Sequence, residues 1–154
     1  MVESEGSFGL SKDERKLTEE AMKTEINKIR KAIDIVENQE NLDGRFKQGS
    51  KRYEIKLKME LYETISSYID LLSQNSEAMA QKSGYYEDKC YFFRVLGDFS
   101  RYGISVATTK LSYSERSKLF TQEDEDNISY LNSKSEKFKT MSLEFYTQAD
   151  KFAR

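Results

Sequence analysis

The chain has 154 residues, of which 37% are hydrophobic and 34% are charged, with a formal net charge of −2. This length suits one ordinary domain, and 10 Tyr with 9 Phe are too many aromatic residues for a disordered protein. The charge balance gives no bulk attraction for nucleic acid, and no apolar run approaches the roughly 20 residues that span a bilayer. We therefore expect a single soluble domain over residues 1–154 that binds neither nucleic acid nor membranes. Its expected location is the cytoplasm, with the nucleus as a further location.

Pro and His are both absent from the chain, and each absence narrows the possible classes of fold or function. There is no Pro and there are only 7 Gly, which favours long uninterrupted helices and an all-α fold. There is also no His, and Cys90 is the single cysteine, so the usual general base, the usual zinc ligand and an internal disulfide are all missing. We expect a non-enzymatic protein without a cofactor.

The first expected helix begins after a flexible segment at residues 1–10. Ser11 and Glu14 have the spacing of a capping box, which predicts a helix start there, and the helix is expected to run to about Gln39. Apolar residues recur along it at mostly three- and four-residue steps and predict one buried stripe: Leu17, Ala21, Ile26, Ile29, Ile33 and Val36.

The next segment, ENQENLDGRFKQGS, contains Gly44 and Gly49 and has the composition of a loop. A second helix is expected from near Lys51, with the break after it at Ser83 and Gly84. Its predicted buried stripe consists of Leu61, Ile65, Tyr68, Ile69 and Leu72.

A third helix is expected from about Tyr86, with a stripe of Phe92, Val95, Leu96, Phe99, Tyr102 and Val106. Gly97 lies inside it, where an exposed Gly would cost about 1 kcal/mol relative to Ala. Close packing against another helix is the expected reason for this glycine.

Residues 110–127 contain scattered polar residues and four consecutive acids from Glu123 to Asp126, which is consistent with an extended loop or a weak helical extension. A last helix follows, with Leu131, Phe138, Phe145 and Phe152 at seven-residue steps, and no stop signal precedes Arg154. The predicted architecture is an antiparallel array of four long helices.

One group of residues could bind a phosphate. Lys23 and Arg30 are seven residues apart, so they share one face of the first helix about 10 Å apart. Arg94 and Arg101 have the same spacing on the third helix, and Tyr102 adds a phenolic donor. Packed together, these side chains could hold a phosphate dianion. The alternative is that the cations form ordinary solvated faces and Tyr102 belongs to the core.

The segments LSKDERKLTEEAMK, KIRKAIDIVENQE and YFFRVLGDFSRY resemble successive stretches of the 14-3-3 family, in the same order and spacing. The second helix and the ending SLEFYTQADKFAR also resemble that family, so the resemblance runs from about Leu10 to Arg154. It implies the central helices of a 14-3-3 domain, and a protein that binds phosphorylated client proteins or peptides.

The resemblance also implies roles for individual residues. Lys23, Arg30, Arg101 and Tyr102 match the four family positions that hold the phosphate of phosphoserine or phosphothreonine, and Arg94 replaces a lysine of the peptide groove. The expected function is therefore that of a signalling adaptor. The alternatives are a helical scaffold of the same fold that has lost phosphopeptide binding, and an enzyme, for which the adjacent Glu19 and Glu20 point apart on a helix.

Some positions depart from the family pattern. Asp34 replaces an arginine that borders the pocket, Thr24 replaces an asparagine, and Gly103 and Ser105 replace a leucine and an acid. If Asp34 reaches the pocket, it should weaken the binding of anions.

The family's first two helices and last three helices have no counterpart here, and we expect this chain to be part of a longer protein or a shortened member of the family. Tyr53, Lys56 and Glu60 match positions that contact a partner subunit. Because most of that contact belongs to the missing helices, a homodimer or heterodimer is expected only for the complete domain.

Overall fold

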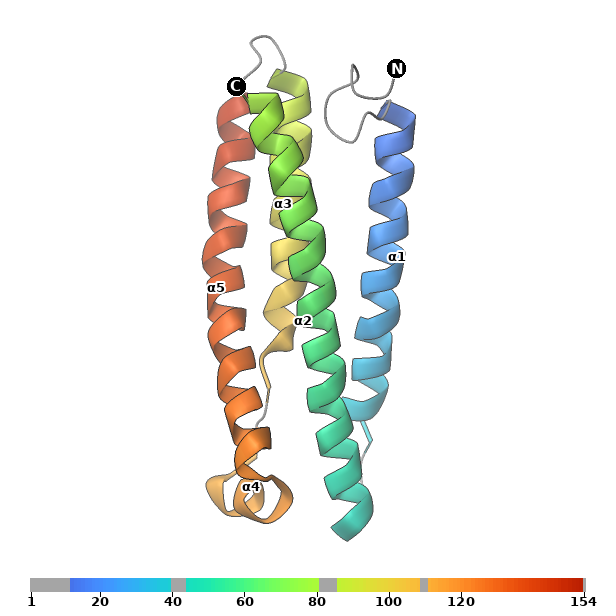
Figure 1. Ribbon diagram of the computed structural model, residues 1–154, viewed down its shortest axis with the longest axis vertical. Helices are drawn as coiled ribbons and strands as arrows, with labels where there is room; N and C mark the ends of the chain where they lie inside the picture. Colours follow the sequence, from blue (N-terminus) through green and yellow to red (C-terminus); the bar gives the residue numbers. More distant parts are fainter. Residues whose placement is uncertain (1–11, 40–43, 81–85, 109–110, 154) are drawn as a thin grey trace.

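The computed structural model describes residues 12–39, 44–80, 86–108 and 111–153, and within these ranges it contains helices and no strand. The helices are α1 (Lys12–Glu37), α2 (Gly44–Ala80), α3 (Tyr86–Gly103), the short 3-10 helix η3 (Ile104–Val106), α4 (Tyr113–Leu119) and α5 (Gln122–Ala153). Four of them are long, and they run alternately up and down the molecule (Figure 1). The prediction of an all-α antiparallel array is confirmed.

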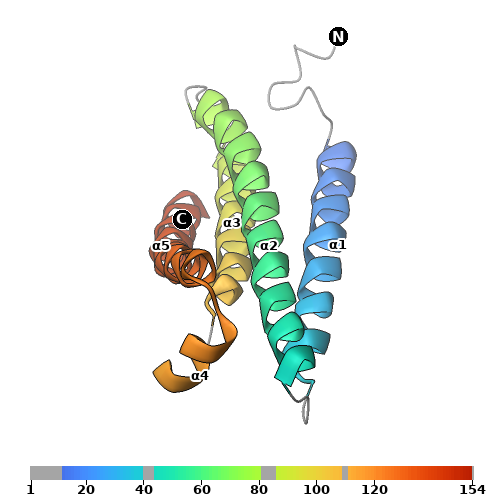
Figure 2. The same cartoon turned by 60° about the horizontal axis from the view of Figure 1, so that its bottom comes forward.

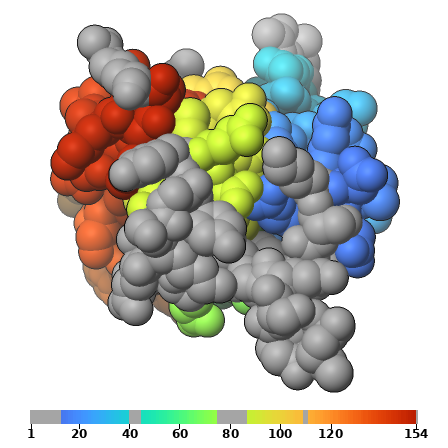
Figure 3. Space-filling model, turned by 90° about the horizontal axis from the view of Figure 1, so that it is seen from above, coloured from blue at the N-terminus to red at the C-terminus, as the bar shows by residue number. Residues whose placement is uncertain are grey.

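The two middle helices of the array are α2 and α3. Helix α1 packs on α2, whereas α5 packs on α3 and on α2 (Figure 2). Seen from above, α3 lies between α5 and α1 (Figure 3). Because the chain reverses at each connection, α1 and α3 run parallel to one another, and the polar contacts described below link them.

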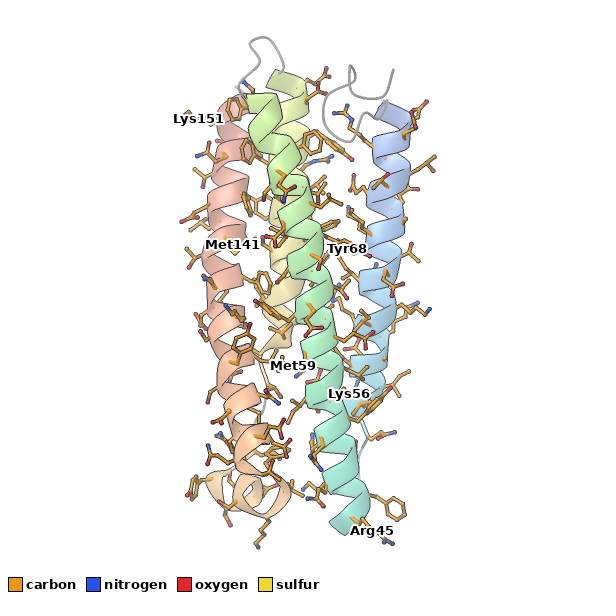
Figure 4. All side chains as sticks on the ribbon, in the orientation of Figure 1. Arg45, Lys56, Met59, Tyr68, Met141 and Lys151 are labelled. Atoms are coloured by element: carbon orange, nitrogen blue, oxygen red, sulfur yellow. The ribbon has the colours of Figure 1, made fainter. Side chains whose placement is uncertain are left out.

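One hydrophobic core runs through all four long helices, and most of the predicted apolar stripes form it. Ile26, Leu61, Phe92, Phe99 and Leu131 are fully buried. Figure 4 shows the side chains between the helices, including Tyr68 of α2, whose ring centroid lies 6.2 Å from that of Phe99. Burial of these aliphatic and aromatic side chains is the main favourable contribution to folding.

The predicted stripe of α1 is wrong in its first half. Leu17 is 66% exposed and Ala21 is also exposed, whereas Arg15 is 9% exposed. The guanidinium of Arg15 lies over the rings of Tyr91 and Phe92, 5.2 and 5.5 Å from their centroids. Leu17 is about 200° further round the helix than Arg15, so it faces away from α3.

One predicted boundary is also wrong, and of the two alternatives for residues 110–127 the helical one is observed. Helix α2 begins at Gly44 rather than near Lys51, and its first turns are held by α4: Lys47 pairs with Glu115 at 3.2 Å, and Gln48 donates a hydrogen bond to the carbonyl of Leu119. The segment 110–127 is not an extended loop, because α4 and the start of α5 occupy most of it.

The start of α5 explains the acidic cluster. The Thr121 and Asp124 side chains each accept a hydrogen bond from the other residue's backbone N–H, at 3.2 and 3.0 Å, as in a capping box. The acids of the first turn are favoured there because the helix dipole is positive at this end.

The predicted role of Gly97 is confirmed, because the ring of Tyr146 packs directly on it. The predicted cap at Ser11, the segment 1–10 and the break at Ser83 and Gly84 lie outside the described residues. None of the described helices has an apolar stretch long enough to cross a membrane.

Candidate functional site

The boundary between α1 and α3, called here the α1–α3 seam, is bridged by polar side chains. The contacts that cross it include, in chain order, Arg15 with Asp88 (2.9 Å), Tyr91 with Glu19 (2.8 Å), Lys23 with Asp98 (3.8 Å) and the Arg30 guanidinium over the Tyr102 ring (4.9 Å to the centroid). Both helices therefore present charged groups to a shared surface instead of closing it with apolar residues.

Three of the predicted phosphate-binding residues meet at this seam. The guanidinium carbons of Arg30 and Arg101 lie 4.9 and 5.0 Å from the centroid of the Tyr102 ring. Together with Lys23 these residues are called the cationic cluster. Tyr102 is half-buried and packs against the core at Phe99, so the ring has a defined position for both cations.

Within the described part of the chain, neither Arg30 nor Arg101 forms an ion pair with a carboxylate. Arg30 donates one hydrogen bond to the side-chain amide oxygen of Asn27 at 3.3 Å, and Arg101 donates from Nε to the hydroxyl of Tyr146 at 3.3 Å. Two cations that share one aromatic ring repel each other unless an anion lies between or beside them. This arrangement can accept an anionic group.

Lys23 is more strongly compensated than the two arginines. Its Nζ lies 2.5 Å from a carboxylate oxygen of Glu19 and 3.8 Å from one of Asp98. Burial alone would lower the pKa of Lys23, but the hydrogen bond to Glu19 and the negative groups nearby raise it above its ordinary value. Lys23 therefore remains charged, and the carboxylates of Glu19 and Asp98 offset part of its positive charge in the absence of a ligand.

Two residues that the sequence did not identify as functional support the cluster. Tyr146 of α5 donates a hydrogen bond to Asp98 at 2.5 Å and accepts the one from Arg101. Asp98 and Tyr146 lie in two of the segments that resemble the 14-3-3 family, but periodicity does not show which residues of α5 reach α3. Only the packing of the two helices brings them together.

Arg94 does not join the ring of Tyr102. Its guanidinium lies 5.8 Å from the centroid of the Tyr91 ring, and its charge contributes to the lowered pKa of Glu19. It lines a cleft of about 530 Å³ at the start of the seam, together with Arg15, Glu19 and Lys23. The cleft adjoins the cationic cluster through Lys23.

Asp34 would weaken anion binding if it reached the phosphate site, but it lines a second cavity. This cavity has a volume of about 320 Å³ and is also lined by Glu37, Glu54 and Lys58. The ammonium of Lys58 contacts three acceptors in this region. Its Nζ is 2.8 Å from the carbonyl of Ala107, 3.2 Å from Glu54 and 3.3 Å from Glu37. Its lining residues come from α1, from α2 and from the chain after η3.

The remaining chemistry is limited. Among the described residues no group of three His, Cys, Asp or Glu side chains could hold a metal ion. Compared with models of protein families, with curated proteins and with solved structures, the chain has no match. The 14-3-3 resemblance therefore stays a prediction. The features that bear on function are the side chains and contacts of the α1–α3 seam.

Proposed function

We propose that this protein is a non-enzymatic adaptor of the 14-3-3 type, which binds phosphoserine or phosphothreonine segments of client proteins in the cytoplasm or nucleus. The observation that supports this proposal best is the pair of guanidinium groups, Arg30 from α1 and Arg101 from α3, on one tyrosine ring without a carboxylate partner among the described residues.

The chemistry of a phosphate monoester fits this pair. Such a group carries nearly two negative charges at pH 7 and offers three acceptor oxygens. Guanidinium groups bind phosphate through paired hydrogen bonds, which are stronger than neutral ones. The phenol of Tyr102 can add a neutral donor, and Lys23 adds a nearby positive charge.

The surroundings of the cluster favour a peptide over a small ion. The 530 Å³ cleft precedes the cluster along the seam. The seven residues from Lys23 to Arg30 cover about 10 Å of helix, which corresponds to about three residues of an extended peptide. Residues flanking the phosphorylated side chain would therefore lie along the seam.

A second candidate is a helical scaffold of this fold without phosphate dependence. The observation that favours it is the state of Lys23, whose ammonium is already held by Glu19 and lies near Asp98. The two candidates differ in one measurable property, which is whether a phosphate group is required for binding.

Fluorescence anisotropy with a labelled phosphoserine peptide and its unphosphorylated twin tests the proposal. We expect at least about tenfold tighter binding of the phosphopeptide, and a similar loss in Arg101→Gln, because a charged hydrogen bond contributes about 1.5–3 kcal/mol.

Lys134→Gln is the matched control, since Lys134 lies near Tyr62 and Tyr130 at the α2–α5 boundary. It removes one positive charge and should leave the affinity unchanged. Equal binding of both peptides, or an equal loss in the two variants, would favour the scaffold.

A further inference from the structure

Tyr146 has a fixed place beside the cationic cluster. Its ring packs on Gly97, where the absence of a side chain leaves room for it, and the neighbouring Ser142 donates a hydrogen bond to the carbonyl of Gly97 at 3.2 Å. These contacts hold α5 against α3 at this level. The Tyr146 hydroxyl therefore has a fixed position against α3.

That point lies between a carboxylate and a guanidinium of the same helix. Tyr146 donates to Oδ1 of Asp98 at 2.5 Å and accepts from Nε of Arg101 at 3.3 Å. Burial and the hydrogen bond to Asp98 raise the pKa of Tyr146, against the opposing effect of Arg101. The phenol thus remains protonated and keeps its role as donor to Asp98.

Asp98 and Arg101 would otherwise be expected to pair. Residues three apart on a helix are neighbours, and opposite charges at that spacing attract. The structure nevertheless has no ion pair between them within 4 Å; instead, the other oxygen of Asp98 faces Lys23 at 3.8 Å. The Tyr146 hydroxyl is instead hydrogen-bonded to both the carboxylate and the guanidinium.

Building on the phosphate site proposed above, we infer that Tyr146 is a positioning residue for phosphate recognition. Its hydroxyl bridges Asp98 and Arg101, which keeps that carboxylate from forming a direct ion pair with that guanidinium. The bridge uses Nε, and no described residue accepts a hydrogen bond from the two terminal nitrogens of Arg101, so these can donate to phosphate oxygens. Tyr146 acts through Arg101 and has no contact with the ligand itself.

The test is a double-mutant cycle between Tyr146→Phe and Asp98→Asn, with phosphopeptide affinity as the readout. Tyr146→Phe keeps the ring on Gly97 and removes only the hydroxyl, so we expect the fold to be retained and the affinity to fall about five- to tenfold. In the Asp98→Asn background, where no carboxylate can pair with Arg101, the same change should reduce affinity less than twofold. An equal loss in both backgrounds, or no loss in either, would overturn the inference.

Tyr130→Phe is the matched control, because it removes another tyrosine hydroxyl of α5, one that donates to Tyr62 at 3.3 Å instead. Its affinity for the phosphopeptide should equal that of the unchanged protein. Circular dichroism of all variants monitors folding independently.

A second readout needs no ligand and separates this inference from the proposed function. The Nε–Hε NMR signal of Arg101 in the free protein should shift and exchange faster with water in Tyr146→Phe, and should not respond to Tyr130→Phe. If the unchanged protein does not bind the phosphopeptide, the proposed function fails, and an unaltered Arg101 signal in Tyr146→Phe would separately overturn the bridging role.

Discussion

The ring of Tyr146 lies so close to Gly97 that a Cβ atom at residue 97 would come within 2.7 Å of the ring atoms Cδ1 and Cε1. This contact joins α5 to α3 beside the cationic cluster, and it depends on a glycine in the middle of a helix. Glycine is unfavourable in a helix, but here its lack of a side chain allows the two helices to pack closely.

Gly97→Ala should lower the stability of the protein. Alanine favours the helix by about 1 kcal/mol, but displacing the ring of Tyr146 should cost about 1–3 kcal/mol and break its hydrogen bond to Asp98. Urea denaturation measures the difference. Gly49→Ala is the control, since nothing lies within 4 Å of a Cβ atom there, and it should stabilise the protein by about 0.5–1 kcal/mol. The same response in both variants would contradict the steric role of Gly97.

Lys58→Met should destabilise the protein by about 3 kcal/mol, because the buried carboxylate of Glu54 loses its closest cation and keeps the more distant Lys51, at 3.5 Å. The double variant Lys58→Met/Glu54→Gln should be more stable than Lys58→Met alone, since no buried charge is then left without its partner.

Chemical denaturation of both variants measures these changes. Lys139→Met is the control, because Lys139 and Glu136 form an exposed pair whose loss should cost less than about 1 kcal/mol. A Lys58→Met variant as stable as Lys139→Met would show that the buried network contributes little.

Glu19→Gln should reduce the dependence of stability on acidic pH. Burial raises the pKa of this carboxyl, but its hydrogen bonds with Lys23 and Tyr91 outweigh burial, and the pKa is lowered from the ordinary 4.5. A lowered pKa in the folded state means that the contribution is present above about pH 4.5 and is lost as the pH falls through the folded value.

The free energy of unfolding measured between pH 3 and 7 should therefore fall less steeply for Glu19→Gln than for the unchanged protein. The difference should be about 1 kcal/mol or less, because solvent screens this partly exposed pair. Glu20→Gln removes the adjacent, exposed carboxylate and should leave the slope nearly as it was. Parallel curves for Glu19→Gln and the unchanged protein would contradict the prediction.

Arg30, which belongs to the cationic cluster, and Arg94, which lies outside it, should differ in their effect on phosphopeptide affinity. Arg30 contacts the Tyr102 ring, whereas Arg94 lies against Tyr91 at the neighbouring cleft. We expect Arg30→Gln to weaken binding by about tenfold or more and Arg94→Gln by less than about threefold. Anisotropy titrations at two salt concentrations measure both. A larger loss in Arg94→Gln would move the phosphate site from Tyr102 to the cleft.

The helices themselves could be derived from the sequence. Proline, the strongest helix breaker, is absent from the chain. The helical period of the sequence is enough to predict apolar stripes such as Phe92, Val95, Leu96 and Phe99, which are buried. The shared face of Lys23 and Arg30 follows in the same way, because seven residues make nearly two full turns.

What the tertiary structure decided depends on contacts between helices. Periodicity assigned Leu17 to the core, but the neighbouring rings of α3 bury Arg15 instead. Likewise, no period along one helix relates Tyr146 to Arg101, which are 45 positions apart in the chain. Local sequence determines which face of a helix is apolar, whereas the partners of a charged side chain are determined by which helices pack together, at which angle and level. The sequence alone therefore predicted a set of cations, and only the packed structure showed which of them pair with carboxylates among the described residues and which do not.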